Sequence, residues 1–122
     1  MPVERLPGPA GASYSSAVAV TGGGRLVHVS GQLAPGGDLA AQAGRCFDRI
    51  ESILAEVGGS LRDVVSIRAY LTSLDDYADY ARVRAERFGD ALPASAAVQV
   101  AGLLEGALVE IEAVAYVERR PR

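Results

Sequence analysis

The sequence holds few residues that bind metals or form covalent links: one cysteine, one histidine and no lysine. Cys46 cannot form a disulfide within the chain, and Cys46 with His28 cannot supply the four ligands of a structural zinc site, so we expect no metal. Because all 12 basic residues are arginine, a mechanism that passes through a lysine Schiff base is excluded. Carboxylates, hydroxyls, phenols, amides, one imidazole and guanidinium groups remain for chemistry.

Long apolar runs and basic clusters are also missing. No apolar stretch approaches the roughly 20 residues of a membrane-spanning helix, and the first residues do not open a secretory signal, so we expect a cytoplasmic protein with no membrane partner. The formal net charge of -3, without a dense basic patch, gives little electrostatic basis for binding nucleic acid. With 122 residues, 49% of them hydrophobic, the chain is expected to form one folded core.

The N-terminal part of the chain predicts an arm followed by a hairpin. Residues 1–12 carry three prolines and two glycines without periodicity, which favours a loop or arm before a single domain over residues 13–122. Short β-rich runs at residues 16–20 and 25–30 are joined through three glycines, and this pattern predicts an antiparallel hairpin. Similar patterns predict further strands at residues 64–71, 94–101 and 108–117.

Two helices are predicted between these strands. Asp38 is a good N-cap for a helix over residues 39–57, which ends at two glycines and has Cys46 in its apolar stripe, where we expect a packing role. Ser73 is the expected N-cap of a second helix. The inner face of that second helix is predicted to consist of Leu74, Tyr77, Ala81, Ala85 and Phe88, with Arg82, Arg84 and Arg87 in solvent.

The expected order is therefore β-β-α-β-α-β-β, an α+β fold in which two helices cover one face of a mixed sheet. Its last strand places two carboxylates, Glu110 and Glu112, on a face that also carries apolar side chains. Burying an unpartnered carboxylate is costly, so that face must meet polar groups. It is also too apolar to stay open, and a closed homo-oligomer with polar clefts between subunits would cover it.

Several segments, in order along the chain, carry a resemblance. Tyr14 precedes the first predicted strand and Ser30-Gly31-Gln32 ends the second. Further along stand AEVGGSLRDVV at residues 55–65, YLTSL at residues 70–74, and Pro93-Ala94, VQVA and GALVEIEA up to Ala113. With these segments the sequence resembles the Rid (RidA/YjgF) family of reactive-intermediate deaminases over nearly its whole length from Tyr14 onward.

The resemblance implies a chorismate-mutase-like (YjgF-like) subunit in a homotrimer, with sheets inside, helices outside and small-molecule clefts between subunits. Many members hydrolyse enamines and imines such as 2-aminoacrylate to a keto acid and ammonia, without metal or organic cofactor. In that mechanism a strand arginine binds the substrate carboxylate, and a carboxylate on the last strand positions or activates water. A tyrosine and the serine-glycine loop shape the pocket.

Carried over by position, Tyr14, Ser30 and Gly31 match pocket residues, and Glu110 matches the water-activating carboxylate. The arginine is absent, because Ser95 follows Pro93-Ala94 where the family's deaminases have arginine, and Ala97 occupies the small or cysteine position two residues on. Strand alternation places Ser95, Ala97 and Gln99 on one face, which we expect to pair with the face that carries Glu110.

This replacement predicts weak or absent activity on 2-imino acids. Arginine makes a bidentate, charge-assisted pair with a carboxylate, whereas serine offers one short donor. Two further residues are possible parts of the pocket. His28 is either an acid or base beside the pocket or an interior histidine, and Arg68 either supplies the missing cation or forms a salt bridge with Glu110 or Glu112.

Three functions remain open on the sequence. The first is a Rid-type enzyme that acts on a small imine, enamine or related metabolite in an intersubunit cleft. The second is a trimeric small-molecule-binding or regulatory protein without turnover. The third, an endoribonuclease as some family names state, is disfavoured by the acidic net charge.

Overall fold

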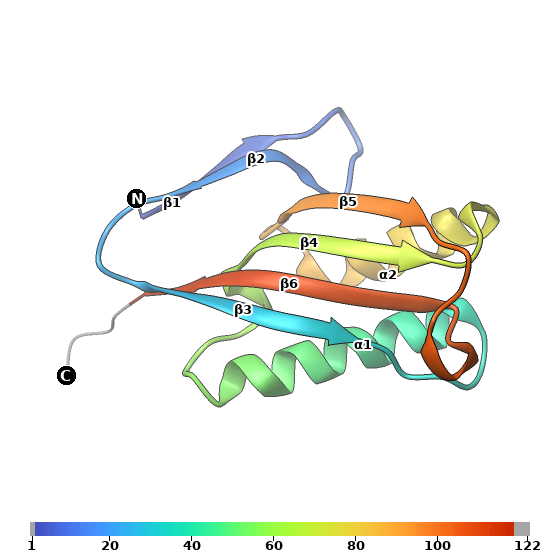
Figure 1. Ribbon diagram of the computed structural model, residues 1–122. Helices are drawn as coiled ribbons and strands as arrows, with labels where there is room; N and C mark the ends of the chain where they lie inside the picture. The colour runs from blue at the N-terminus through green and yellow to red at the C-terminus, as the bar shows by residue number, and fades with distance from the viewer. Residues whose placement is uncertain (1, 119–122) are drawn as a thin grey trace.

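The computed structural model describes residues 2–118, which form a six-stranded mixed sheet with two helices on one face (Figure 1). The strand order is β1-β2-β5-β4-β6-β3. This architecture confirms the predicted α+β fold with two helices on a mixed sheet. The bounds are β1 Val3–Pro7, β2 Ser15–Val20, β3 Arg25–Gln32, α1 Leu39–Ala55, β4 Val64–Leu71, α2 Tyr77–Phe88, β5 Ala94–Gln99 and β6 Val109–Val117.

The middle of the sheet is formed by β4, which runs parallel to β5 and antiparallel to β6. Alternate residues of β6 are buried beneath the helices, as strand periodicity predicts. They pack against aromatic and aliphatic side chains of both helices, including Phe47 and Phe88, whose rings meet edge to face at 5.3 Å. One face of the sheet thus carries the core, and the other remains uncovered in the single chain.

The first helix follows its sequence signals closely. Asp38 caps α1, since its carboxylate accepts a hydrogen bond from the Ala41 backbone N–H at 2.9 Å. Cys46 is fully buried and its thiol donates to the carbonyl of Gln32 at 3.2 Å. Burial raises the pKa of the Cys46 thiol to about 11, so the packing role expected for this residue agrees with its surroundings.

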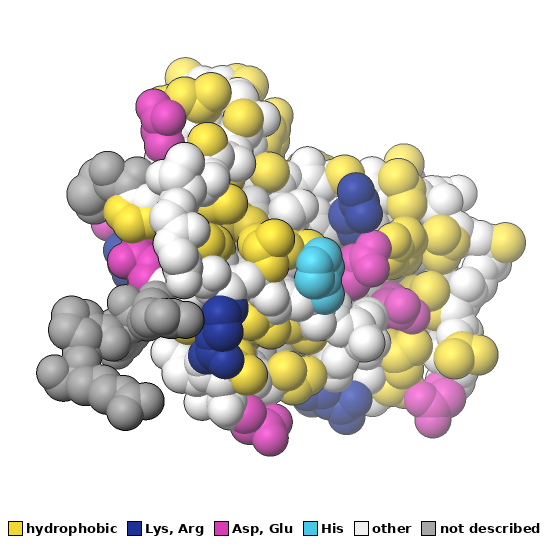
Figure 2. Space-filling model, turned by 60° about the vertical axis from the view of Figure 1, so that its left-hand side comes forward, with side chains coloured by type: hydrophobic (Ala, Val, Ile, Leu, Met, Phe, Trp, Pro, Cys, Tyr) yellow, Lys and Arg dark blue, Asp and Glu magenta, His cyan; other side chains and the backbone are white. Residues whose placement is uncertain are grey.

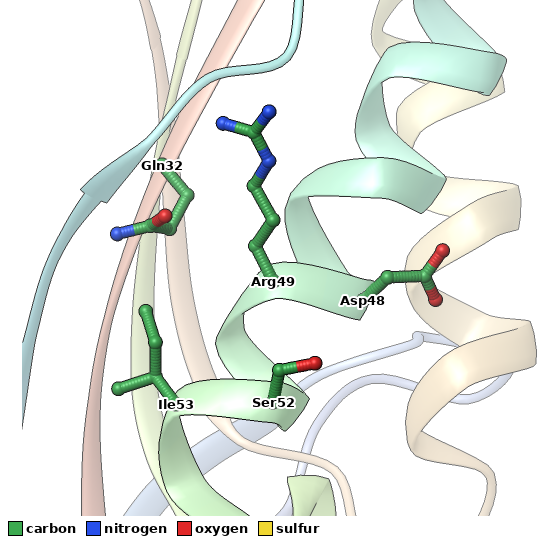
Figure 3. Close-up of a pocket in the computed structure, with 5 residues that line it drawn as sticks. All are labelled: Gln32, Asp48, Arg49, Ser52 and Ile53. Carbon is green, nitrogen blue, oxygen red and sulfur yellow. The ribbon is translucent and has the colours of Figure 1, made fainter.

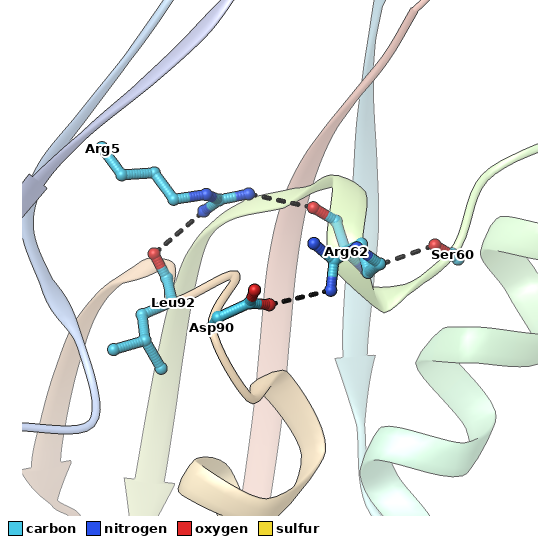
Figure 4. Close-up of polar contacts among 5 residues, drawn as sticks. All are labelled: Arg5, Ser60, Arg62, Asp90 and Leu92. Carbon is cyan, nitrogen blue, oxygen red and sulfur yellow. Dashed lines mark hydrogen bonds and ion pairs between the residues drawn. The ribbon is translucent and has the colours of Figure 1, made fainter.

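The N-terminal segment differs from the expected loop, because residues 3–7 form strand β1. It pairs antiparallel with β2, from Val3 opposite Val20. Arg5 fastens the strand to the rest of the domain by donating to the carbonyls of Leu92 and Arg62, both at 2.9 Å (Figure 4). The prolines misled the prediction because β1 is an edge strand with Pro7 as its last residue, a position where a missing N–H costs no ladder bond.

The predicted hairpin between residues 16–20 and 25–30 is also wrong. Strand β2 lies between β1 and β5, which it meets at one register pair, Ser15 with Ala94. Strand β3 lies at the opposite edge and pairs with β6. The glycine linker therefore carries the chain across the end of the sheet (Figure 1). Strand propensity identified both runs, but it contains no information about which strands become neighbours.

The second helix presents a different face from the one predicted. A 3₁₀ turn, Leu74–Asp76, precedes α2, and Ser73 caps this turn by accepting from the Asp75 N–H at 3.2 Å. Within α2 the buried stripe is rotated from the predicted one, because the larger side chains of Tyr80 and Val83 face the core in place of Ala81 and Ala85. Leu74 and Tyr77 are exposed, by 48% and 38%. The buried residues of α2 are Tyr80, Val83, Arg84 and Phe88.

This change of phase corrects the expectation that all three helix arginines stay in solvent. Arg82 is exposed and pairs with Asp79 at 2.9 Å, as a solvated arginine would. Arg84 instead points inward and is only 2% exposed. No helix within residues 2–118 has the length and apolar character needed to cross a membrane.

Candidate functional site

A β-bulge near the end of β3 holds the first group of candidate residues. The register passes from Val29 opposite Ala113 to Gln32 opposite Ile111, so Ser30 and Gly31 together oppose a single residue of β6. Bulges of this kind redirect side chains and often occur beside active sites. Here the missing side chain of Gly31 leaves room for the neighbouring Glu110 carboxylate, whose carboxyl carbon would lie 2.9 Å from a Cβ at this position.

The two carboxylates of β6 lie in different surroundings. Glu112 accepts a hydrogen bond from the Tyr70 hydroxyl at 2.5 Å and lies 4.0 Å from Nη1 of Arg68. The hydrogen bond to Glu112 raises the pKa of Tyr70. Glu110 is half-buried and, among residues 2–118, has no hydrogen bond or ion pair. Its carboxylate is therefore free to accept a proton or hold a water molecule.

The uncovered face of the sheet has a polar hollow among apolar side chains. Its volume is about 310 Å³, and its lining includes His28, Arg68, Ser66 and Glu112. Figure 2 shows the histidine on the surface beside acidic and basic side chains, with hydrophobic side chains around them. His28 is exposed, in contrast to the interior position that was one of its two expected locations. Arg68 is also exposed and meets Glu112 at the limit of an ion pair.

Ser95 lies on the opposite side of the sheet from Glu110, which overturns the predicted pairing of their faces. Strand β4 separates β5 from β6, and the register places Ser95 beside Ile67 and Glu110 beside Tyr70. Because neighbouring partners in a sheet share a face, Ser95, Ala97 and Gln99 face the helices. The error came from treating two strands that follow one another in sequence as neighbours in space.

The surroundings of Ser95 contain a residue that the sequence reading missed. Nη1 of Arg84 donates to Oγ of Ser95 at 3.0 Å. The Cζ atom of Arg84 lies 5.5 Å from the centre of the Tyr14 ring. Tyr14 and Ser95 are therefore brought together at the inner face of α2, and Ala97 follows half-buried on the same strand. The signal that could have found Arg84 is its helical spacing with Tyr80 and Phe88, which are also buried.

The candidate residues thus form two groups in one chain. The bulge group consists of Ser30, Gly31 and Glu110, and the Arg84 group consists of Ser13, Tyr14, Ser95, Tyr77, Tyr80 and Arg84. Two strand spacings and the thickness of the sheet separate Glu110 from Ser95. Adjacent strands alone are about 4.8 Å apart, so one small molecule could not touch both groups within a single chain.

A second hollow, of about 300 Å³, lies between the end of β3 and α1 (Figure 3). Arg49 donates to the carbonyl of Leu33 at 2.7 Å, and the Gln32 amide donates to the carbonyl of Ser30 at 2.9 Å. Asp48 points away from them toward α2, where it pairs with Arg87 at 2.5 Å. The polar groups that line this second hollow therefore do not converge on one point. Over residues 2–118 there is likewise no cluster of three side chains able to hold a metal ion.

Comparison with known proteins places this fold and these residues in a family. The profile of the family described as Endoribonuclease L-PSP matches residues 5–117. A RutC family protein of Pyrococcus abyssi is 39% identical over an alignment of 123 positions, and this alignment covers 94% of each chain. The 2-iminobutanoate/2-iminopropanoate deaminase of Bos taurus is 40% identical over 86 residues, or 70% of this chain and 62% of the bovine protein.

A solved structure agrees with these relatives. A member of the YjgF/YER057c/UK114 family from Mycobacterium tuberculosis is 37% identical and superimposes with a TM-score of 0.74 over 94% of this chain and 99% of that one. The family profile spans both groups of candidate residues and every strand from β2 to β6, and it begins within β1. The chain therefore belongs to the Endoribonuclease L-PSP family, which is also the YjgF or Rid family.

Proposed function

We propose that this protein hydrolyses a small imine or enamine, with Glu110 as the residue that activates water. The observation that carries this proposal is the state of Glu110: a half-buried carboxylate, set against the bulge at Gly31 and without a partner in the described part of the chain. Two relatives in the family are named as deaminases, the bovine 2-iminobutanoate/2-iminopropanoate enzyme and the 3-aminoacrylate deaminase RutC of Acinetobacter baylyi.

The chemistry requires one base and one water molecule. Glu110 accepts a proton from water, and the oxygen adds to the imine carbon. The same carboxyl then returns its proton to nitrogen, which gives a carbinolamine. Glu110 next takes the proton of the new hydroxyl group and delivers it to nitrogen, and the carbon–nitrogen bond breaks to give a carbonyl compound and ammonia. An enamine first takes a proton on carbon and loses one from nitrogen to become the imine. Every proton in this sequence moves between substrate, water and Glu110.

The separation of the two groups supports an active site shared between copies of the chain. The uncovered sheet face exposes Leu26 and Val98 around the polar hollow, and such a face favours association. In the proposed homotrimer, the bulge group of one copy meets the Arg84 group of its neighbour, so that the ligand binds in a cleft between subunits. A monomeric mass in solution, measured by light scattering, would contradict this assembly.

Ser95 sets an expectation about the substrate. If its hydroxyl were the sole contact for a substrate carboxylate, turnover of 2-imino acids would be weak or absent, because one neutral donor replaces a bidentate charged pair. Binding without turnover remains the second candidate, favoured by the fact that no group within residues 2–118 donates a hydrogen bond to the Glu110 carboxylate. RNA cleavage ranks last, since Glu110 and Glu112 make the open face acidic.

Ammonia release tests the proposal directly. Purified protein is assayed with 2-iminopropionate generated in situ and with a neutral ketimine of similar size. We expect Glu110→Gln to lower the rate of ammonia release by roughly 10²- to 10⁴-fold, as for loss of a general base. The matched control is Glu86→Gln, an exposed residue of α2. Absence of ammonia release from either substrate in the native protein would favour the binding-only function.

A further inference from the structure

The single histidine of the chain lies on the uncovered face of the sheet, beside an ion pair. His28 of β3 is the register partner of Val114 of β6, so Glu112 is its diagonal neighbour on that strand. Glu112 in turn lies directly opposite Arg68 of β4. All four side chains line the polar hollow of about 310 Å³. Three strands therefore bring an imidazole, a carboxylate and a guanidinium together on one face.

The carboxylate of this cluster already has its partners. Glu112 accepts a hydrogen bond from the Tyr70 hydroxyl at 2.5 Å and lies 4.0 Å from Nη1 of Arg68. Within residues 2–118 no hydrogen bond or ion pair joins His28 to a carboxylate. While the imidazole is neutral, the charges of Arg68 and Glu112 cancel. A proton on His28 would add a positive charge that has no anion of its own.

The remaining ionisable groups of this face cannot balance that charge. Glu110 lies opposite Tyr70, about 13 Å along the sheet from the position of His28, which is too far for an ion pair. The Tyr116 phenol is neutral near pH 7 and donates to the carbonyl of Thr21 at 2.7 Å. Both helices pack against the opposite face of the sheet (Figure 1). Over the described part of the chain, Glu112 is therefore the carboxylate nearest to the imidazole.

Exposed apolar side chains surround the cluster (Figure 2). Leu26 shares its face with His28 by strand alternation, and Val98 shares it as the register partner of Tyr70. A second copy of the chain on this face would bury these side chains and remove water from the cluster. A balanced ion pair tolerates such burial far better than an unpaired charge does. Balanced charge also favours a copy of the chain as the partner over a strongly acidic or basic one.

We propose that this open face is the contact between copies of the chain and that His28 makes the contact sensitive to pH. The inference rests on the assembly proposed above, adds its regulation, and does not depend on imine hydrolysis. An ordinary imidazole takes up a proton near pH 6.5, on average. Copies therefore associate above this pH, and association weakens as the pH falls through it, because only separated chains leave a protonated His28 in water.

Sedimentation velocity at pH 7.5 and at pH 5.5 tests the contact. Carboxylates ordinarily titrate near or below pH 4.3, so they stay charged in this interval. We expect the chain concentration at half-assembly to rise about tenfold or more at pH 5.5, as for one proton taken up by each separated chain. His28→Gln should assemble equally at both pH values. Glu86→Gln, on the exposed side of α2, is the matched control and should keep the native pH dependence.

Arg68→Gln should reverse the effect of pH. Glu112 then lacks its guanidinium, and a protonated His28 becomes the cation beside it, so association should strengthen at pH 5.5. Circular dichroism checks that each variant remains folded. Native assembly that is equal at both pH values, or a native pH dependence in His28→Gln, would overturn the histidine contact and leave the homotrimer standing. A folded monomer at both pH values would overturn the contact and the intersubunit cleft together, whereas ammonia release would still report on the deaminase function.

Discussion

Replacing Gly31 with alanine should displace the Glu110 carboxylate without unfolding the protein. A Cβ on Gly31 would lie 2.9 Å from the carboxyl carbon and 3.1 Å from Cγ of Glu110, whereas ordinary contact begins near 3.4 Å. The carboxyl carbon must therefore move by at least 3.4 − 2.9 = 0.5 Å, and the oxygen nearest the glycine by more. A displacement of about 1 Å at a catalytic group costs up to roughly 100-fold in rate.

We expect kcat for imine hydrolysis to fall about 10- to 100-fold, which corresponds to about 1.4 to 2.7 kcal/mol of transition-state stabilisation. The free energy of unfolding should change by less than about 1 kcal/mol, because the end of a flexible side chain can rotate away. Ammonia release and urea unfolding measure the two effects. Gly23→Ala is the control, since a Cβ there meets nothing within 4 Å.

A double substitution makes this prediction refutable in a second way. Glu110→Ala removes every atom that a Cβ at residue 31 would meet. If the two residues act through this contact, Gly31→Ala should cost little further activity once Glu110→Ala is present. Losses that simply multiply, or a Gly31→Ala variant with native kcat, would show that the carboxylate does not need its place beside the bulge.

Three other measurements follow from the structure. Because burial raises the pKa of Cys46 from 9.0 to about 11, a thiol reagent at pH 8 should react with this residue only when the protein unfolds, and rapid reaction in native buffer would contradict this. The free energy of unfolding should keep the full contribution of the buried thiol below pH 9 and should decrease as the pH rises toward 11. Asp38→Ala should destabilise the protein by about 1 kcal/mol in urea unfolding, as for a lost N-cap, whereas Asp75→Ala, which removes no side-chain cap, should not. Arg84→Gln and Glu110→Gln chains that are each of low activity alone, when mixed in equal amounts, unfolded and reassembled, should give about a quarter of native activity if each site joins two chains in a ring; no gain over the separate variants would contradict a site shared between two chains.

Local sequence patterns predicted what depends on local interactions. The N-cap and apolar spacing of α1 and the bounds of β4 agree with the structure, because both elements have continuous periodic patterns, although α1 ends at Ala55 and not at residue 57. The alternation along β6 likewise placed Glu110 and Glu112 on the half-exposed face. The Rid resemblance supplied the overall fold, which periodicity alone would have left as an unspecified α+β arrangement.

Local sequence patterns do not indicate which strands lie next to one another in the sheet. The insertion of β4 between β5 and β6 puts Ser95 and Glu110 on different faces, although the two strands follow one another in sequence. The edge strand β1 was hidden by flanking prolines. Arg84 was missed because the predicted stripe of α2 passed through Ala81 and Ala85, and a rotation of less than one turn exchanges a solvent-facing position for a buried one.

The single register pair that joins β2 to β5 has a consequence for local unfolding. The ribbon of β1 and β2 is tied to the domain mainly there and through Arg5, so it should open as its own cooperative unit. Ser13 and Tyr14 lie immediately before β2, and each opening would carry them off the Arg84 guanidinium. Amide hydrogen exchange in β1 and β2 should therefore be faster than exchange in β4 and β6.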